Sequence, residues 1–469
     1  MISHATQLLT TLLKNNNIQV PANRMQLLNV FVQDETNLGA INTIIKNQDQ
    51  LMAKWKLENR IADIRQQSVR IPNGTVGKPY EARFDFDLLG WKDLSEFEFE
   101  GLQDIGLQYD LKLKLITGIP AKSGDHKIIF KFKVSGQPVD QPFIEKIIPL
   151  IINPDPRSLW KTLDSDKADP WWKEDDVTTF ASLGPFHLLV SSKRGRSHAN
   201  VGSFREDDFA FSELENGWNI VVVADGAGSA KASRKGSSIA CNSVVEYFKE
   251  PGTVDNMKEF DQLIPGFKNN TGEDIAARIN KLVYNNLGKA VFRVHKKLEE
   301  FAATNNLALK DLNSTLIFTL IKKYQEGFAF LSFGVGDCPI AIINKDKTDV
   351  ILMNWLDVGE FGGGTRFITM AEIFKNEKFA SRFGFKLTDD FSYLMLMSDG
   401  IYDPKFVVEN ALGDIKKWQQ LLADLGGKNE DGIAVVFDKD NPDIVSQFSR
   451  WMDFWSPGNH DDRTLAIVF

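Results

Sequence analysis

Acidic residues stand at or just beyond the ends of five apolar segments of this sequence. They are Asp225 after IVVVA, Asp337 after FLSFGVG, Asp399 after LMLMS, Asp461 and Asp462 before RTLAIV, and the acids of REDD (205–208) before FAF. A single acid of this kind is typical of a turn, but neighbouring strands could bring all five ends to one place. Clustered carboxylates repel one another unless a cation lies between them, so the pattern indicates a metal site.

The ligands that this site would offer are hard oxygen atoms. The chain has two cysteines, Cys241 and Cys338, far apart and without CxxC spacing, and six histidines. Carboxylate ligands favour Mg²⁺ or Mn²⁺ over zinc. Gly226, directly after Asp225, would let a backbone carbonyl face an ion closely, since glycine has no side chain to crowd it.

Six motifs occur in an order that resembles the metal-dependent type 2C serine/threonine protein phosphatases. They are REDDF, VVVADGAGSAKASRKGS, NSTLIFTLI, FGVGDCPI, LMSDGIYD and DDRTLAIV, within about residues 185–469. One Asp-Gly pair would be a weak signal, but the ordered set is specific. The element GRSH (195–198) makes the chain most similar to the bacterial branch of the family.

The resemblance implies hydrolysis of phosphoserine or phosphothreonine esters on proteins by a metal-activated water. It implies two ions, with a third at a weaker site. The residues that match the family's two-ion ligands are Asp207, Asp225, Asp399, Asp461 and the carbonyl of Gly226. Glu206 matches a residue that acts through bound water, and Asp337 and Asp403 match the positions of the third ion.

The arginine with which many family members bind the substrate phosphate is missing here. Its position holds Gly202, and Arg205 occupies the place of the asparagine in the acidic element. Phosphate binding would then fall to Arg196, His198 or Arg205, of which we favour Arg196 and His198. The competing interpretation is that these residues only build the loop before the strand.

The general acid is a second departure from the pattern. Animal members often have a histidine directly after Asp-Gly, where this chain has Ala227. Protonation of the leaving group is therefore expected from His198 or from solvent. His460, next to Asp461, is a further candidate, although a histidine beside an acid is more often an ordinary surface pair.

The elements that would position these residues divide the 469 residues into several domains. Residues 1–70 carry apolar stripes at helical spacing, and 71–152 carry the alternating runs EFEFE, LKLKL and IIFKFKV. The second stretch resembles an immunoglobulin- or cadherin-like β-sandwich. Residues 153–180 are expected to be a linker, because NPDPRSLWK bars continued helix or strand. Residues 181–469 are expected to be the phosphatase domain.

The expected fold class is α+β. The resemblance implies that the phosphatase domain is an α-β-β-α sandwich, two antiparallel sheets flanked by helices. In the linker, Trp171 and Trp172 are expected to fix the chain onto the domain that follows. FGGGTRFIT (361–369) is expected to be a mobile flap, because three consecutive glycines keep the backbone loose. The alternative, a phosphate-binding glycine loop, is disfavoured because the segment has neither the Lys-Ser/Thr pair nor the GxGxxG spacing of such loops.

Composition limits the partners. A net charge of −8 without a basic block argues against nucleic acid, and no apolar run is long enough for a bilayer. Two separate cysteines and the absence of a leader pattern favour the cytoplasm. The expected partners are a phosphorylated protein and, from the resemblance, a serine/threonine kinase in bacterial signalling. The rival hypotheses are a degenerate phosphatase domain that only binds phosphoprotein, and another two-metal phosphoesterase.

Overall fold

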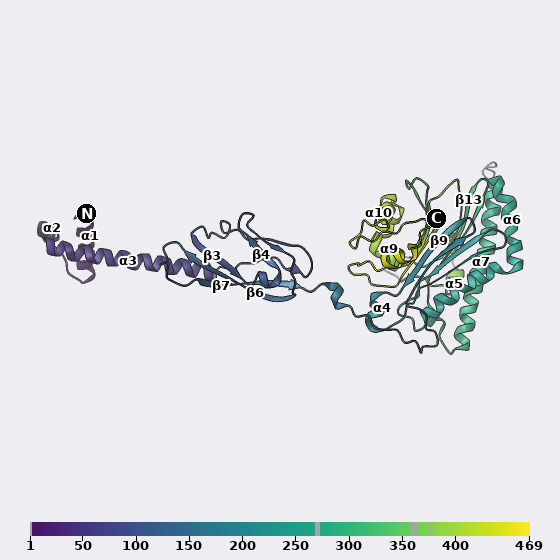
Figure 1. The fold of residues 1–469 in the computed structure, drawn as a ribbon, viewed down its shortest axis with the longest axis horizontal. Helices are drawn as coiled ribbons and strands as arrows, with labels where there is room; N and C mark the ends of the chain where they lie inside the picture. The colour runs from purple at the N-terminus through teal and green to yellow at the C-terminus, as the bar shows by residue number, and fades with distance from the viewer. Residues whose placement is uncertain (1, 268–272, 358–363, 376) are drawn as a thin grey trace. The chain divides into compact units, whose positions relative to one another are not determined.

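The computed structural model describes residues 2–267, 273–357, 364–375 and 377–469. The chain divides into two compact units, Met1–Leu159 and Trp160–Phe469 (Figure 1). Short 3-10 helices occur at Ala22–Arg24, Gln103–Ile105, Pro156–Leu159, Leu309–Leu312, Glu377–Arg382 and Glu409–Gly413. No helix within the described ranges combines the length and the apolar composition that a membrane span requires.

The first unit begins with three helices, α1 (Ile2–Asn15), α2 (Met25–Gln33) and α3 (Glu35–Gln66). The side chain of Asp34 starts α3, because it accepts hydrogen bonds from the backbone N–H groups of Thr36 and Asn37, each at 3.1 Å. Ala5, Val32 and Ile41 form a small core between the helices. At its other end, α3 packs Ile64 into the core of the strands that follow.

The strands of the first unit form two sheets. One has the order β1 (Gly74–Thr75), β7 (Ile144–Asn153), β6 (Gly124–Val134), β3 (Leu94–Glu100), and the other β2 (Tyr80–Arg83), β5 (Leu115–Gly118), β4 (Leu107–Asp110). Only the short β1–β7 pair is parallel among these described strands. Every second residue of β7 is buried, as the alternating sequence predicts.

The prediction of a strand at LKLKL was wrong. Residues 111–114 form a turn between β4 and β5, and Leu111 and Leu113 are exposed. Asp110 drives the turn, because its side chain accepts the N–H groups of Lys112 and Leu113 at 2.8 and 2.9 Å. Alternation alone predicted a strand, but the local hydrogen bonds of this aspartate decide the structure.

The second unit contains a five-stranded and a six-stranded sheet. The first has the order β10 (Asp208–Glu213), β11 (Asn219–Ala224), β12 (Leu316–Tyr324), β13 (Gly327–Val335), β16 (Phe383–Thr388). The second has the order β15 (Val350–Leu352), β14 (Ile340–Ile343), β17 (Tyr393–Met397), β18 (Arg463–Val468), β9 (Phe186–Lys193), β8 (Asp176–Leu183). All of these pairings are antiparallel.

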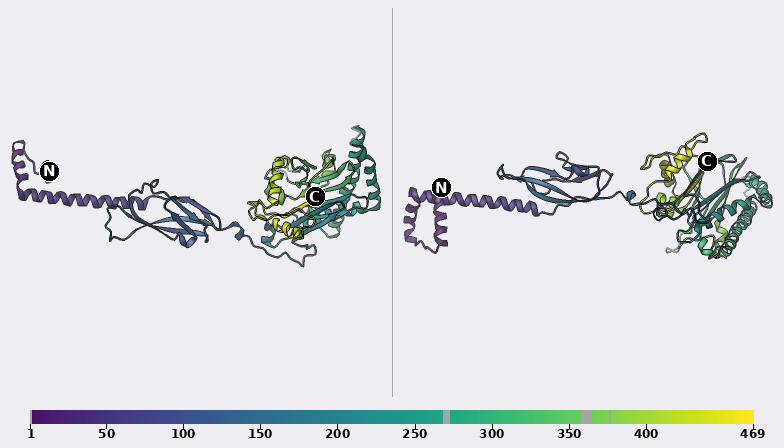
Figure 2. Two further views of the ribbon diagram at one scale, coloured as in Figure 1. Left: turned by 45° about the horizontal axis from the view of Figure 1, so that its top comes forward. Right: turned by 60° about the horizontal axis from the view of Figure 1, so that its bottom comes forward.

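Apolar residues from both sheets of this unit share one core, which includes Val190, Val223, Ile317 and Leu396. The other side of the five-stranded sheet packs on α5 (Ser233–Lys249), α6 (Pro251–Phe267) and α7 (Glu273–Thr304). The other side of the six-stranded sheet packs on α9 (Asp399–Phe406), α10 (Ile415–Leu425) and α11 (Ile444–Trp451) (Figures 1 and 2). Two short helices, α4 (Arg196–Val201) and α8 (Glu372–Lys375), complete the unit. The expected mixed α+β class is confirmed.

Residues 153–180, which were expected to form a linker, belong largely to the second unit in the structure. Strand β8 already begins at Asp176, and the segment from Trp160 onward belongs to the second unit. Trp171 packs at the edge of the core under α5 and α7, and the indole of Trp172 donates a hydrogen bond to Ser165 at 3.0 Å. Proline and acidic residues prevent regular structure here, but they do not prevent packing.

Candidate metal centre

Strand register brings the predicted acids to one end of the two sheets. Asp208 lies opposite Ala224 in the β10–β11 pair, so the preceding Asp207 and the following Asp225 leave the sheet together. Met397 of β17 lies opposite Leu465 of β18, which places Asp399 and Asp461 at the corresponding ends of the other sheet. The hydroxyl of Thr464 in β18 donates to the Asp207 carboxylate at 2.8 Å. This hydrogen bond links the acids of the five-stranded sheet to those of the six-stranded sheet.

The acids repel one another strongly. Burial raises the pKa of Asp225 well above its usual value, and the charges of Asp399, Asp207 and Asp461 raise it further. Burial, and then the charges of Asp461, Asp337 and Asp207, also raise the pKa of Asp399. The pKa of Asp207 rises to about 7, first through burial and then through Asp462. Each carboxylate is therefore within electrostatic range of the others.

Asp461 is the member of the cluster closest to solvent. Burial and then Asp462 raise its pKa, yet its side chain remains exposed, whereas Asp207 is only 1% exposed. Solvent therefore reaches the cluster on the side of Asp461.

The residues present fit a divalent cation. Several carboxylates at one place, each made more basic by its neighbours, are the donor set that hard cations bind. A Cβ atom on Gly226 would lie 2.5 Å from the carbonyl oxygen of Glu206, so only glycine allows the two segments to approach this closely. Glycine is thus required at position 226 because the segment around Glu206 lies so close to it, a reason that the sequence did not reveal.

Asp337 and Asp403 lie beside this cluster. Burial raises the pKa of Asp337, and its carboxylate accepts the hydroxyl of Thr365 at 2.7 Å. Burial and then Asp337 raise the pKa of Asp403, whose carboxylate accepts the amide of Asn459 at 3.4 Å. The predicted flap, 361–369, lies partly outside the described residues.

Glu206 makes contacts that the sequence did not predict. One oxygen of its buried carboxylate accepts the Ser233 hydroxyl at 2.7 Å and the backbone N–H of Arg234. These donors lie in the first turn of α5, where a negative charge is favourable. Burial raises the pKa of Glu206 despite the Ser233 hydrogen bond. In this structure Glu206 therefore fixes the start of α5 against the acidic element.

Asp462 makes contacts within the site for which the sequence analysis assigned it no role. One of its oxygens accepts the N–H of Gly195 at 2.6 Å and Nδ1 of His198 at 2.9 Å, and the other accepts the N–H of Glu206. Burial opposes the charge on His198, but the bond to Asp462 outweighs it and raises the pKa of His198 to about 9. The doubled acid before RTLAIV was the available signal, but it did not distinguish the roles of Asp461 and Asp462.

Potential ligand atoms of His198, Asp461 and Asp462 lie within 4.8 Å of one another, a spacing that could itself hold an ion. Both oxygens of Asp462 already accept hydrogen bonds, however, and His198 directs Nδ1 toward them. We therefore assign Asp462 to the positioning of His198 and of the acidic element. A Cβ atom on Gly228 would lie 3.3 Å from Nε2 of His198, so the far side of the imidazole faces the turn after Asp225.

The candidate phosphate-binding groups differ in their surroundings. Arg196 donates to the carbonyl of Asp453 and lies 5.6 Å from the ring centre of Trp455. Arg205 is 3% exposed and donates to the carbonyls of Glu174 and Asp207 at 2.9 and 2.7 Å and to the hydroxyl of Ser192 at 2.6 Å. Arg205 is therefore a buried anchor for the acidic element and an unsuitable phosphate ligand.

His460 is enclosed by aromatic rings. Its imidazole lies 4.4 Å from the ring of Trp160 and 4.8 Å from that of Trp455, measured between ring centres. Burial, and then the charges of Arg463 and Arg196, lower the pKa of His460. This packing favours a structural role beside Asp461.

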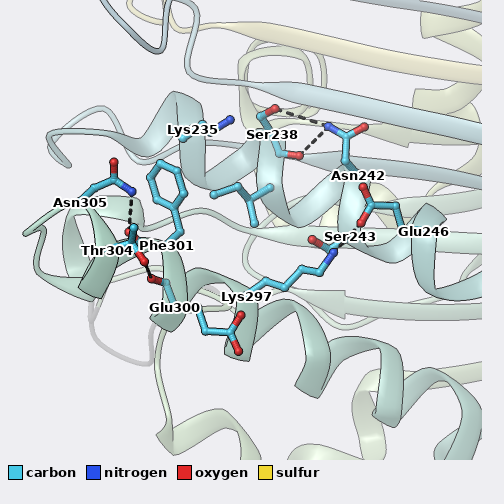
Figure 3. Close-up of a pocket in the computed structure, with 11 residues that line it drawn as sticks. Lys235, Ser238, Asn242, Ser243, Glu246, Lys297, Glu300, Phe301, Thr304 and Asn305 are labelled. Carbon is cyan, nitrogen blue, oxygen red and sulfur yellow. Dashed lines mark hydrogen bonds and ion pairs between the residues drawn. The ribbon is translucent and has the colours of Figure 1, made fainter.

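A groove of about 660 Å³ lies elsewhere, between α5 and α7. Lys235, Ser238 and Asn242 line it from α5, and Lys297 and Phe301 line it from α7 (Figure 3). None of the predicted metal ligands lines this groove. It is therefore separate from the carboxylate cluster.

Comparison with family models supports the family resemblance. The family model for protein phosphatase 2C matches residues 194–431, slightly more than half of the chain. The chain belongs to the protein phosphatase 2C family. A comparison with curated proteins finds no match.

Several solved structures are similar to a part of this chain. A bacterial serine phosphatase is 15% identical and covers 60% of this chain and 96% of its own, with a TM-score of 0.36. The serine/threonine phosphatase of S. agalactiae is 15% identical and covers 61% and 99%, with a TM-score of 0.37. The catalytic domain of the serine/threonine protein phosphatase PstP, in complex with two manganese ions, is 15% identical and covers 62% and 98%, with a TM-score of 0.34.

Proposed function

We propose that this protein hydrolyses phosphoserine and phosphothreonine esters on proteins with the help of bound divalent cations. The observation that carries the proposal is the cluster of Asp207, Asp225, Asp399 and Asp461, in which burial and mutual repulsion raise the pKa values. Membership of the protein phosphatase 2C family supports the reaction class.

These four aspartates, with the carbonyl of Gly226, would hold two Mg²⁺ or Mn²⁺ ions, and Asp337 and Asp403 a third. Bound divalent ions would neutralise phosphoryl oxygens and lower the pKa of a water molecule. The chain itself supplies the fixed geometry. Glu206 ties the acidic element to α5, and Asp462 ties it to the segment that carries His198.

His198 is the side chain best suited to donate to the substrate phosphate or to the leaving oxygen. Asp462 holds Nδ1 and stabilises the protonated ring, whose pKa is about 9. A cation held in this way can donate through Nε2, on the opposite side of the imidazole. Arg196 would assist at the rim, although its present contacts are with Asp453 and Trp455.

We further propose an α-β-β-α sandwich for the second unit and an immunoglobulin- or cadherin-like β-sandwich for the strands of the first. The proposed domains of the first unit are 1–70 and 71–152. We move the start of the proposed phosphatase domain from residue 181 to Trp160, because the segment from Trp160 onward belongs to the second unit. A cytoplasmic location fits the two buried free cysteines. A serine/threonine kinase acting on the same phosphoprotein in bacterial signalling would complete the proposed role.

Asp225→Asn and Asp399→Asn test the assignment. Each should reduce the Mn²⁺-dependent hydrolysis of p-nitrophenyl phosphate by about 100-fold or more, because a charged ligand is lost. Asp346→Asn, at an exposed position, is the matched control. Activity close to that of the wild type in either variant would contradict the metal centre. Binding of phosphoprotein without turnover would favour a degenerate domain, and turnover restricted to other phosphate esters would favour another phosphoesterase.

A further inference from the structure

The segment before β8 is attached along its length to the elements of the metal centre. We call residues 160–175 the strap; they lie outside the range that matches the family model, 194–431. In its first half, the backbone N–H of Lys161 donates to the side chain of Asn200 at 3.0 Å, and that of Leu163 donates to the carbonyl of Ala199 at 2.9 Å. Both acceptors belong to α4, the helix that carries His198.

The second half of the strap reaches the acidic element itself. Asp169 forms an ion pair with Arg234 of α5 at 2.8 Å. The carbonyl of Glu174 accepts Nε of Arg205 at 2.9 Å. The side chain of Lys173 is largely buried, with only 15% of it exposed.

Lys173 places its ammonium group among three oxygen atoms. Nζ donates to the carbonyl of Asp207 at 2.6 Å, to the carboxylate of Asp208 at 3.2 Å and to the hydroxyl of Ser237 at 3.4 Å. Arg205 donates to the same Asp207 carbonyl at 2.7 Å. Two cationic donors therefore fix the backbone of Asp207, whose carboxylate lies among other acids. Hydrogen bonds from charged donors are about twice as strong as neutral ones.

We infer that Lys173 is a positioning residue for the metal ligand Asp207, and that the strap is an integral part of the catalytic unit. This inference rests on the proposed function. Repulsion from neighbouring acids tends to displace the Asp207 carboxylate in the metal-free protein, and the contact at its carbonyl opposes that movement. Groups that support ligands in this way commonly contribute about 10- to 100-fold to metal affinity.

Lys173→Met and Lys173→Gln in the full chain test this role, with Lys161→Met, an exposed lysine of the same strap, as the control. Mn²⁺ affinity is measured by calorimetry on chelator-treated protein, and folding by near-ultraviolet circular dichroism. Both variants should bind Mn²⁺ about tenfold more weakly, while kcat and KM for p-nitrophenyl phosphate at saturating Mn²⁺ stay within about threefold of the wild type. If Lys173 had a merely structural role, its variants would be less stable but would not combine a weaker Mn²⁺ affinity with nearly unchanged kcat and KM at saturating Mn²⁺.

The glutamine variant keeps a hydrogen-bond donor and carries the test if the methionine variant does not fold. Wild-type Mn²⁺ affinity in either folded variant would overturn the role of Lys173. A wild-type protein that binds no Mn²⁺ and hydrolyses no phosphate ester would instead overturn the proposed function.

Discussion

Asp207→Asn should stabilise the metal-free protein at pH 8. The carboxylate is 1% exposed and has a pKa of about 7 instead of 3.8. At 1.36 kcal/mol per pH unit, its ionisation costs the fold on the order of 4 kcal/mol above pH 7. Asparagine keeps an oxygen that can accept the Thr464 hydroxyl without carrying the charge.

The sign of the pH dependence follows from the raised pKa. Between pH 3.8 and about 7 the folded state binds the proton that the unfolded state has lost, so the stability of the wild type falls as the pH rises. Asp207→Asn has no ionisable carboxylate at this position, so its stability does not fall in this way. Its advantage in free energy of unfolding should be about 1–2 kcal/mol at pH 5 and about 4 kcal/mol at pH 8.

Urea unfolding in EDTA at pH 5 and pH 8 measures this difference, with Asp346→Asn as the surface control. Added Mn²⁺ should reverse the order of stability, because an ion that binds only the folded wild type stabilises it. Equal stability of wild type and variant at both pH values would refute the argument that Asp207 is an ionisable group under repulsion.

Three further perturbations address the surroundings of the cluster. Asp462→Asn should lower the pKa of His198 from about 9 toward its ordinary value, which NMR titration of the imidazole in metal-free protein would detect; an unchanged pKa would contradict the pairing. Gly226→Ala places a Cβ atom 2.5 Å from the Glu206 carbonyl and should destabilise the fold by about 1–3 kcal/mol in urea unfolding, and wild-type stability would argue against the close approach. A chain starting at Trp160 should keep the hydrolysis of p-nitrophenyl phosphate. A chain starting at Asp176 should lose it, because the strap is missing. Equal activity of the two truncated chains would argue against a role of the strap in the catalytic unit.

Sequence predicted the acids at strand ends, because an apolar run that stops at Asp-Gly must leave the core there. Asp225 and Asp399 follow this rule, and the register of β10 with β11 explains why Asp207 joins them. The pairing of His198 with Asp462 could not be predicted in this way. The two residues are separated by 264 positions, and neither has a local pattern that indicates the other.

Irregular segments were the other source of error. The prolines near residue 155 predicted a break in regular structure, but the burial of Lys173 against Asp207 depends on tertiary contacts that composition does not encode. LKLKL alternates as a strand would, yet Asp110 binds the N–H groups of Lys112 and Leu113 and forms a turn. The sequence suggested a place for Glu206 in the site through its position next to Asp207, but the hydrogen bonds of Glu206 to the start of α5 required the fold.

Phosphate release from a phosphothreonine peptide by the full chain tests whether this protein is a metal-dependent phosphatase. We expect saturable release with Mn²⁺, complete loss of release when EDTA is added, and recovery when excess Mn²⁺ is restored. Release at the same rate with and without the chelator, or no release from protein shown by calorimetry to bind Mn²⁺, would contradict a metal-dependent phosphatase.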